Sequence, residues 1–119
     1  MKPGEEQMQI LNQSLIDLEA KGECTLINIT PCNIRIGIAT RPSGRVALTT
    51  ARLIWQWRRE SGEIPFVEIN NISEADIYNG ESLYGVSWVV LSYSKKEIGI
   101  GFATGGQTIW LEQLRRKIK

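Results

Sequence analysis

Residues 44–72 read GRVALTTARLIWQWRRESGEIPFVEINNI, and this stretch decides the fold. Val46 and Leu48 alternate with small or polar residues, which indicates a strand with one buried face. After a tight turn, a second alternating run, rich in aromatic and β-branched residues, begins at Leu53. Strands this close in sequence pair antiparallel, because a parallel crossover needs about a dozen residues or more. The stretch therefore predicts an antiparallel hairpin.

A third strand is expected where the chain becomes apolar again after this hairpin. Pro65 has no amide proton to donate, so it is expected at the beginning of that strand or on a sheet edge. Asn79-Gly80 is a dipeptide typical of tight turns. From residue 60 onward, the expected elements are a turn at 60–63, a strand at 64–72 that continues to 78, a turn at 79–80, a strand at 83–93, a turn at 94–97 and a strand at 98–102.

The first residues predict an amphipathic helix over residues 5–21, with Gly22 suited to the position after its end. Its apolar residues recur at helical spacing and are Met8, Leu11, Leu15 and Leu18. We favour packing of this stripe on the protein's own sheet. A docking or coiled-coil helix is the alternative, for which two heptads are few. We therefore divide the chain into an N-terminal helix, residues 1–21, and one domain, residues 22–119.

Two alternating runs precede the central stretch, over residues 23–30 and 34–39, and Pro31 lies between them. They form either one long strand with a bend or bulge at Pro31 or two strands joined by residues 31–33. Residues 40–44 contain Pro-Ser-Gly, which predicts a loop.

Residues 107–119 predict a C-terminal helix with an apolar stripe that contains Trp110. Six or seven antiparallel strands followed by one helix predict a mainly β protein, a small orthogonal barrel capped by that helix. We expect Trp110 to plug one open end of the barrel. Gly99 and Gly101 are expected to allow the close approach of another element, such as the final helix.

The order of these features resembles the GRAM and bacterial pleckstrin-homology-like domains. Their shared pattern is a glycine, a short apolar strand ending in Leu-Thr, Arg-Leu-Ile-aromatic after a tight turn, and a later Ile-Pro followed by isoleucine. Here it reads Gly44, Leu48-Thr49, Arg52-Leu53-Ile54-Trp55, Ile64-Pro65 and Ile69, with Gly22-Glu23 at the opening. The resemblance covers roughly residues 22–119 and implies a pleckstrin-homology-like (PH-like) barrel that binds proteins or lipids. Trp55 stands where the family more usually has phenylalanine.

Length and composition narrow the range of possible functions. A chain of 119 residues with a net charge of +1 indicates one domain without a global attraction to nucleic acid. The first residues lack an apolar secretory segment, and no apolar run reaches the length of a membrane span, which predicts a cytoplasmic location. Cys24 and Cys32 are then expected to be reduced structural thiols.

Several kinds of catalytic chemistry are excluded or disfavoured. The chain contains no histidine, which excludes histidine general bases and triads. Cys24 is expected to be a buried, inert thiol. Glu74 and Asp76 share a strand face, which we interpret as solvated surface rather than a paired acid site. The glycines at residues 99–106 lack the spacing of a dinucleotide fingerprint and the lysine of a Walker loop. We expect no enzymatic activity, no metal and no cofactor.

The candidate binding site consists of basic residues in three expected loops, at residues 40–44, 58–63 and 94–97. The PH-like resemblance implies that these loops gather at one mouth of the barrel. Trp57 lies at a strand end beside two arginines, whereas the other three tryptophans fit the core. The candidate ligand-binding residues are Arg41, Arg45, Trp57, Arg58, Arg59, Lys95 and Lys96.

The partner expected at this mouth is another protein or a second copy of the chain. The alternative is weak, salt-dependent binding of anionic lipid, which would make the domain peripheral at a membrane. Three glutamates, Glu60, Glu63 and Glu97, partly cancel the six cations. The basic pair of the phosphoinositide pattern is missing as well. No nucleic-acid partner is expected.

Overall fold

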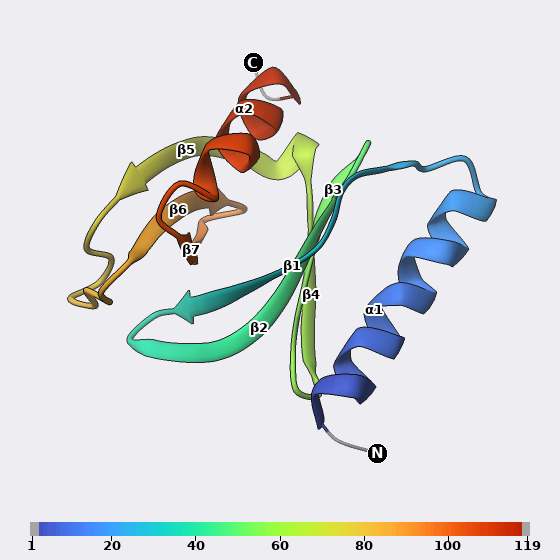
Figure 1. The fold of residues 1–119 in the computed structure, drawn as a ribbon. Helices are drawn as coiled ribbons and strands as arrows, with labels where there is room; N and C mark the ends of the chain where they lie inside the picture. Colours follow the sequence, from blue (N-terminus) through green and yellow to red (C-terminus); the bar gives the residue numbers. More distant parts are fainter. Residues whose placement is uncertain (1–2, 118–119) are drawn as a thin grey trace.

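The computed structural model describes residues 3–117, with side chains described for residues 10–117 (Figure 1). A helix comes first, and strands and a short 3₁₀ helix separate it from the final helix. The elements are α1 (Pro3–Ala20), β1 (Thr25–Ile36), β2 (Ala39–Thr49), β3 (Arg52–Trp57), β4 (Glu60–Pro65), η1 (Phe66–Glu68), β5 (Ile69–Ala75), β6 (Val86–Tyr93), β7 (Lys96–Ala103) and α2 (Gln107–Lys117).

The strands form one 7-stranded antiparallel sheet in the order β4-β3-β2-β1-β7-β6-β5. The sheet curls into a half-barrel, with α2 over one opening and α1 outside, beside β1 and β3 (Figure 1). β4 and β5 are the two edges of the sheet, and each is paired with one strand. The expected mainly β architecture with a helix near each end of the chain is confirmed.

The two alternating runs before the central stretch form one strand, β1, with Pro31 inside it. β1 pairs with β2 on one side and, through residues 33–35, with β7 on the other. Register shifts along its pairing with β2 bend the strand. Of the two interpretations that the sequence left open, one long bent strand is therefore the correct one.

The expected loop at residues 40–44 is wrong, because these residues lie inside β2 and the chain turns at Gly37-Ile38. Opposite Asn33 of β1, β2 has two residues, Pro42 and Ser43. The extra residue makes a β-bulge, in which Ser43 has a positive φ of 61°. The turn-forming residues of this segment therefore build a bulge rather than a loop.

Two further element boundaries in the structure differ from the predicted ones. The β3–β4 turn consists of Arg58 and Arg59, and residues 60–63, expected as a turn, pair with β3. The continuous strand expected after residue 64 is divided by η1, and β5 ends at Ala75. Because β4 and β5 lie at opposite ends of the sheet order, the chain must leave the ladder between them.

The core lies on the concave face of the sheet, and buried apolar side chains from all seven strands and α2 contribute to it. Trp110 of α2 is 1% exposed and stacks on Phe102 of β7, with ring centroids 5.1 Å apart. Leu111 and Leu114 are buried beside it. The expected placement of Trp110 over an open end of the curled sheet is confirmed.

The convex face of the sheet has two smaller apolar clusters. In one, Leu11 and Leu15 of α1 are buried with Ala47 of β2 and Ile54 of β3. The remaining residues of the predicted helical stripe are Leu18, which is partly buried in this cluster, and Met8, whose side chain lies outside the described residues. This contact attaches α1 to the first three strands.

The second convex cluster forms where residues 76–85 cross over β6 and β7. Tyr78 packs against Trp88 with ring centroids 6.1 Å apart. A Cβ atom at Gly99 would lie 2.2 Å from the ring of Tyr78, and one at Gly101 would lie 2.7 Å from Val86. Gly99 therefore admits Tyr78 of this crossing segment, and Gly101 admits the side chains of Val86 and Trp88 in β6, so the expectation that they admit the final helix is wrong.

The β2–β3 turn is held by Thr49, which is fully buried. Its hydroxyl oxygen accepts hydrogen bonds from the amides of Ala51 at 3.2 Å and Arg52 at 3.1 Å, and the hydroxyl donates to Glu23. The guanidinium of Arg52 donates to both carboxylate oxygens of Glu23, at 3.0 and 2.9 Å, and to Glu63 of β4 at 2.9 Å. We call Glu23, Thr49, Arg52 and Glu63 the Thr49 cluster. This cluster connects the segment after α1 with β2, β3 and β4.

The Thr49 cluster changes the ionisation of Glu23. Partial burial disfavours the charged carboxylate, but hydrogen bonds from Thr49 and Arg52 and the charge of Arg52 outweigh it, so the pKa of Glu23 is lowered. A lowered folded-state pKa stabilises the fold above the unfolded-state pKa. That stability is lost as the pH falls through the folded-state pKa.

Replacing Trp110 should leave a cavity in the core where α2 covers the open end of the sheet. We expect Trp110→Ala to lower the free energy of unfolding by about 3–5 kcal/mol, the range for removing a buried aromatic side chain. Ile109→Ala is the matched control, because Ile109 is the preceding residue of α2 and is 51% exposed. Urea denaturation measures both variants, and an unchanged midpoint for Trp110→Ala would contradict this account of the core.

Removing the charge of Glu23 should weaken the Thr49 cluster. We expect Glu23→Gln to lower the free energy of unfolding at pH 7 by about 1–3 kcal/mol, since hydrogen bonds to charged groups are the strong ones. The parent should also lose stability as the pH falls below the ordinary glutamate pKa of 4.5, and the variant should lose less. Denaturation curves over this pH range test both statements. An identical pH dependence in parent and variant would show that Glu23 is not the responsible group.

Candidate functional site

Three of the predicted binding residues, Arg41, Trp57 and Arg58, lie together near the β3–β4 turn, with Glu60 beside Arg41. The guanidinium of Arg58 lies 4.6 Å from the ring centroid of Trp57, and that of Arg41 lies 5.8 Å from it. Arg41 also forms a two-bond fork with Glu60. The indole Nε1 of Trp57 donates to the carbonyl of Pro42 at 2.8 Å. The half-buried ring is therefore fixed between two cations, and one of these cations is already neutralised.

The other predicted residues do not join this group through any contact in the part of the chain that the structure describes. Arg45 is half-buried in β2, where its guanidinium donates to the carbonyl of Gly44 at 3.1 Å. Arg59 is exposed in the β3–β4 turn. Lys95 and Lys96 are exposed at the β6–β7 turn, and the pairing of Arg35 with Gly99 brings that turn toward the β1–β2 turn.

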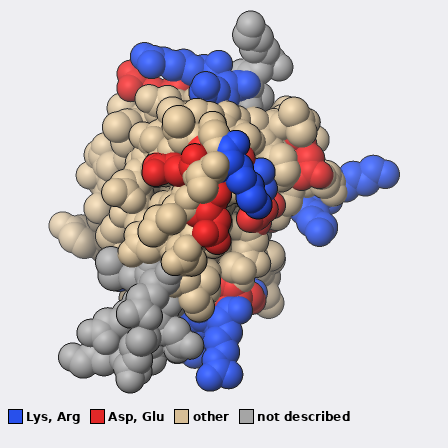
Figure 2. All heavy atoms as spheres, turned by 90° about the vertical axis from the view of Figure 1, so that its right-hand side faces the viewer, with Lys and Arg blue, Asp and Glu red and all other residues tan. Residues whose placement is uncertain are grey.

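The cations do not form one continuous field on the face shown in Figure 2, where lysines and arginines lie in separate groups with acidic side chains beside them. One basic group lies over the C-terminal end of α2, at the top of that view. Its members are Arg115, Arg116 and Lys117, all exposed. These residues are not among the candidate binding residues predicted from the sequence.

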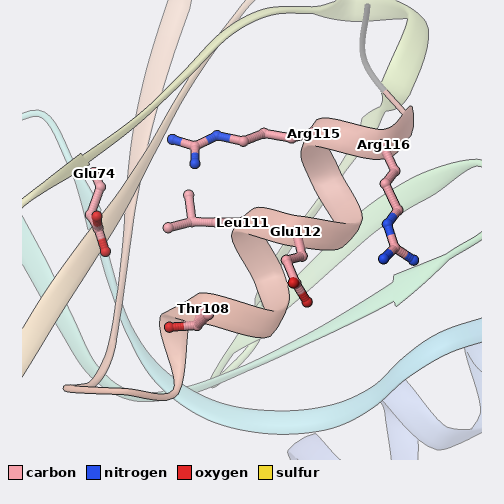
Figure 3. Close-up of a pocket in the computed structure, with 6 residues that line it drawn as sticks. All are labelled: Glu74, Thr108, Leu111, Glu112, Arg115 and Arg116. Carbon is pink, nitrogen blue, oxygen red and sulfur yellow. The ribbon is translucent and has the colours of Figure 1, made fainter.

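A groove lies between this basic end of α2 and the edge strand β5 (Figure 3). Its volume is about 480 Å³, and it is open to solvent. Leu111 supplies the apolar floor, and Arg115 extends from α2 across the groove toward β5 (Figure 3). The lining residues are Glu74, Thr108, Leu111, Glu112, Arg115 and Arg116.

One end of the groove is fixed by a hydrogen-bonded link. The side-chain amide of Gln107, the first residue of α2, donates to the Glu74 carboxylate at 3.0 Å. The side-chain oxygen of Gln107 accepts from the amide of Gly105 at 2.7 Å. The link sets the start of α2 against the last part of β5. Glu74 is exposed, as expected, and Asp76 lies beyond the end of the strand and is no partner for it.

The two cysteines differ in their exposure to solvent. Burial raises the pKa of Cys32 to about 12, against the opposing charge of Arg45, so this thiol is inert. Cys24 is exposed, which corrects the expectation that it is buried. Among the described residues, no three of the cysteines, aspartates and glutamates are grouped as metal ligands. None of the helices between residues 3 and 117 is both long and apolar enough to cross a membrane.

No family model and no curated protein matches this chain. Two solved structures share its fold. The N-terminal PH domain of Vps36 is 15% identical, with a TM-score of 0.62, and the match covers 82% of this chain and 80% of that one. The C-terminal domain of an unknown protein from Leishmania infantum is 17% identical, with a TM-score of 0.62 and coverages of 89% and 95%. Likeness at this identity shows the fold alone, and the chain therefore has a PH-like fold.

Proposed function

We propose that this domain is a non-catalytic interaction module that docks onto another protein in the cytoplasm. PH-like folds typically serve interaction, which supports the class of function but not a partner. The observation that carries the proposal is the groove beside β5, because it combines an apolar floor with an unpaired strand edge. A polypeptide satisfies both features, one with a side chain and the other with its backbone.

A second copy of the chain is one form of such a partner. Self-association through the edges of the sheet is a known hazard of open sheets, and both β4 and β5 are edges here. Sedimentation velocity over a range of protein concentrations distinguishes a self-associating domain from one that needs a different protein.

Binding to anionic lipid is the second candidate, and one observation favours it. Ile38 at the β1–β2 turn is 88% exposed, and the basic β6–β7 turn with Lys95 and Lys96 lies on the same side of the sheet. An apolar tip beside cations is suited to a lipid surface. Two observations weaken the lipid-binding hypothesis, because they leave fewer free cations than the sequence predicted. Arg41 is paired with Glu60, and Arg45 is half-buried.

The two candidates predict opposite results in paired experiments. We expect the purified chain to enrich a shared peptide sequence from a displayed random library, and we expect phosphatidylserine to add little to its sedimentation with phosphatidylcholine vesicles. Sedimentation that depends on phosphatidylserine and is lost in Lys95→Ser/Lys96→Ser, together with failure to enrich any peptide, would overturn the docking proposal in favour of lipid binding.

A further inference from the structure

We propose that residues 76–85 form a strap over the convex face of the sheet, and that this strap opens as a unit while the sheet stays folded. The strap connects β5 to β6, and in its closed position it reaches the turn between β1 and β2 (Figure 1). Opening exposes the side chain of Trp88 and releases that turn. The inference goes beyond the proposed docking function and does not depend on it.

The strap is fastened to the hairpin of β1 and β2 by hydrogen bonds. The carbonyl of Asn79 accepts from Arg35 at 2.7 Å, and the side-chain amide of Asn79 donates to the carbonyl of Gly37 at 2.9 Å. The carboxylate of Glu81 lies 3.9 Å from the guanidinium of Arg35. Arg35 also donates to the hydroxyl of Thr40 at 2.6 Å. One buried cation therefore holds both the strap and the start of β2.

The strap rests on a glycine of β7. The ring of Tyr78 lies over Gly99, where a Cβ atom would collide with it, and packs with Trp88 and Val90 of β6. Gly99 is also the residue of β7 that pairs with Arg35 of β1. The closed strap therefore crosses from β6 over β7 to β1.

The backbone of the strap is separate from the ladder of the sheet. Tyr78 and Glu81 exchange two backbone hydrogen bonds of 3.0 Å, which close a tight turn at Asn79-Gly80. Asn79 and Gly80 have positive φ values of 49° and 80°, as this kind of two-residue turn requires. Because the turn satisfies its own main chain, the strap can leave the sheet without breaking a strand pair.

The closed position leaves buried polar atoms unpaired. Among the described residues, the buried side-chain nitrogen and oxygen atoms without a hydrogen bond are Arg35 Nε, Tyr78 Oη and Trp88 Nε1. All three belong to the strap or to the surface beneath it. The Tyr78 hydroxyl keeps its proton, because burial and the neighbouring Glu97 raise its pKa to about 12, but it meets no acceptor in good geometry. Unpaired buried groups are costly, and water satisfies them once the strap opens.

The outer face of the strap adds little to its attachment. Ile77 is 61% exposed and Tyr84 is fully exposed, so their apolar surface is not buried against the sheet. The closed strap therefore depends on the burial of Tyr78 and of the partly buried Leu83. Since the unpaired groups oppose this burial, opening of the strap costs less free energy than unfolding of the sheet.

Opening of the strap also changes the β1–β2 turn. Ile38 follows Gly37 in this turn and is 88% exposed. When the strap leaves, the carbonyl of Gly37 loses the amide of Asn79, and the turn that presents Ile38 is no longer fixed to β6 and β7. The strap therefore controls how rigidly this apolar tip is held.

The test compares two buried thiols in one protein. Val90→Cys places a thiol beneath the strap, whereas the native Cys32 lies in the concave core and serves as the internal control. Cys24→Ser removes the exposed thiol. We expect an aromatic disulfide reagent, with peptide mass spectrometry as the readout, to label the introduced thiol about 100-fold faster than Cys32 or more, because local opening precedes global unfolding. Equal labelling rates would overturn the inference.

A matched pair of glycine substitutions tests the fastening. Asn79→Gly suits the positive φ but removes the bond to Gly37, so it should speed labelling of the introduced thiol by about twofold to tenfold, the effect of one hydrogen bond. Amide hydrogen exchange at residues 37–39 should quicken as well. Ser94→Gly, at a φ of 44° in the exposed β6–β7 turn, should change neither quantity. Equal effects of the two substitutions, or none from Asn79→Gly, would contradict the proposed fastening.

A double-mutant cycle tests where the strap rests. Gly99→Ala should speed labelling, because the added Cβ displaces the Tyr78 ring, and it should have no further effect in Tyr78→Ala, which has no ring to displace. An equal effect in both backgrounds would show that Gly99→Ala acts on the sheet instead, and it would overturn this account.

The unmodified protein provides a readout that no substitution can disturb. The indole N–H of Trp88 should exchange with deuterium faster than the slowest backbone amides of β6, which report global unfolding. Exchange of the indole proton at the rate of those amides would show that the strap and the sheet open together, and would overturn the inference.

Discussion

One buried hydroxyl group, that of Thr49, holds the β2–β3 turn through its hydrogen bonds. The hydroxyl fixes the β2–β3 turn and thereby the register of the central hairpin, while Arg52 joins that turn to Glu23 and to β4. A shift of one residue in this register would turn every inward side chain of β3 outward. The same register sets the far end of the hairpin, where Arg41 and Arg58 flank Trp57.

Local periodicity accounts for what could be predicted from the sequence. Alternation around Val46 and Leu53 indicates buried strands, and the helical stripe through Trp110 indicates the cap over the core, because burial at these positions repeats with the period of the element. The hydrogen bonds of Thr49, Arg52 and Glu23 also bring together three of the motifs that carry the PH-like resemblance, Leu48-Thr49, Arg52-Leu53-Ile54 and Gly22-Glu23.

Features that arise from pairing between distant residues could not be predicted. Pro42 and Ser43 have the chemistry of a turn, and only the register against β1 shows that they form a bulge. Gly99 and Gly101 indicate a close approach, but the neighbours that they admit, Tyr78 of the crossing segment and Val86 of β6, depend on the fold. The groove joins Glu74 to Arg115, which no local pattern connects. The predicted basic mouth contained Arg41 and Arg45, whose charges proved to be paired or half-buried.

The order of strands has a consequence for the entropy of folding. Each neighbouring pair within β1–β4 and within β5–β7 is consecutive in the chain, and all but β5 and β6, which residues 76–85 connect, are joined by a tight turn. The pairing of β1 with β7, by contrast, joins Asn33 to Gly101 across most of the sequence. Loop-closure entropy grows with the length of chain enclosed, so this seam carries the largest such cost of any strand pair in the sheet. Together with the shared core, its few paired residues make one domain out of two meanders, within each of which every strand pairs with its neighbour in the chain.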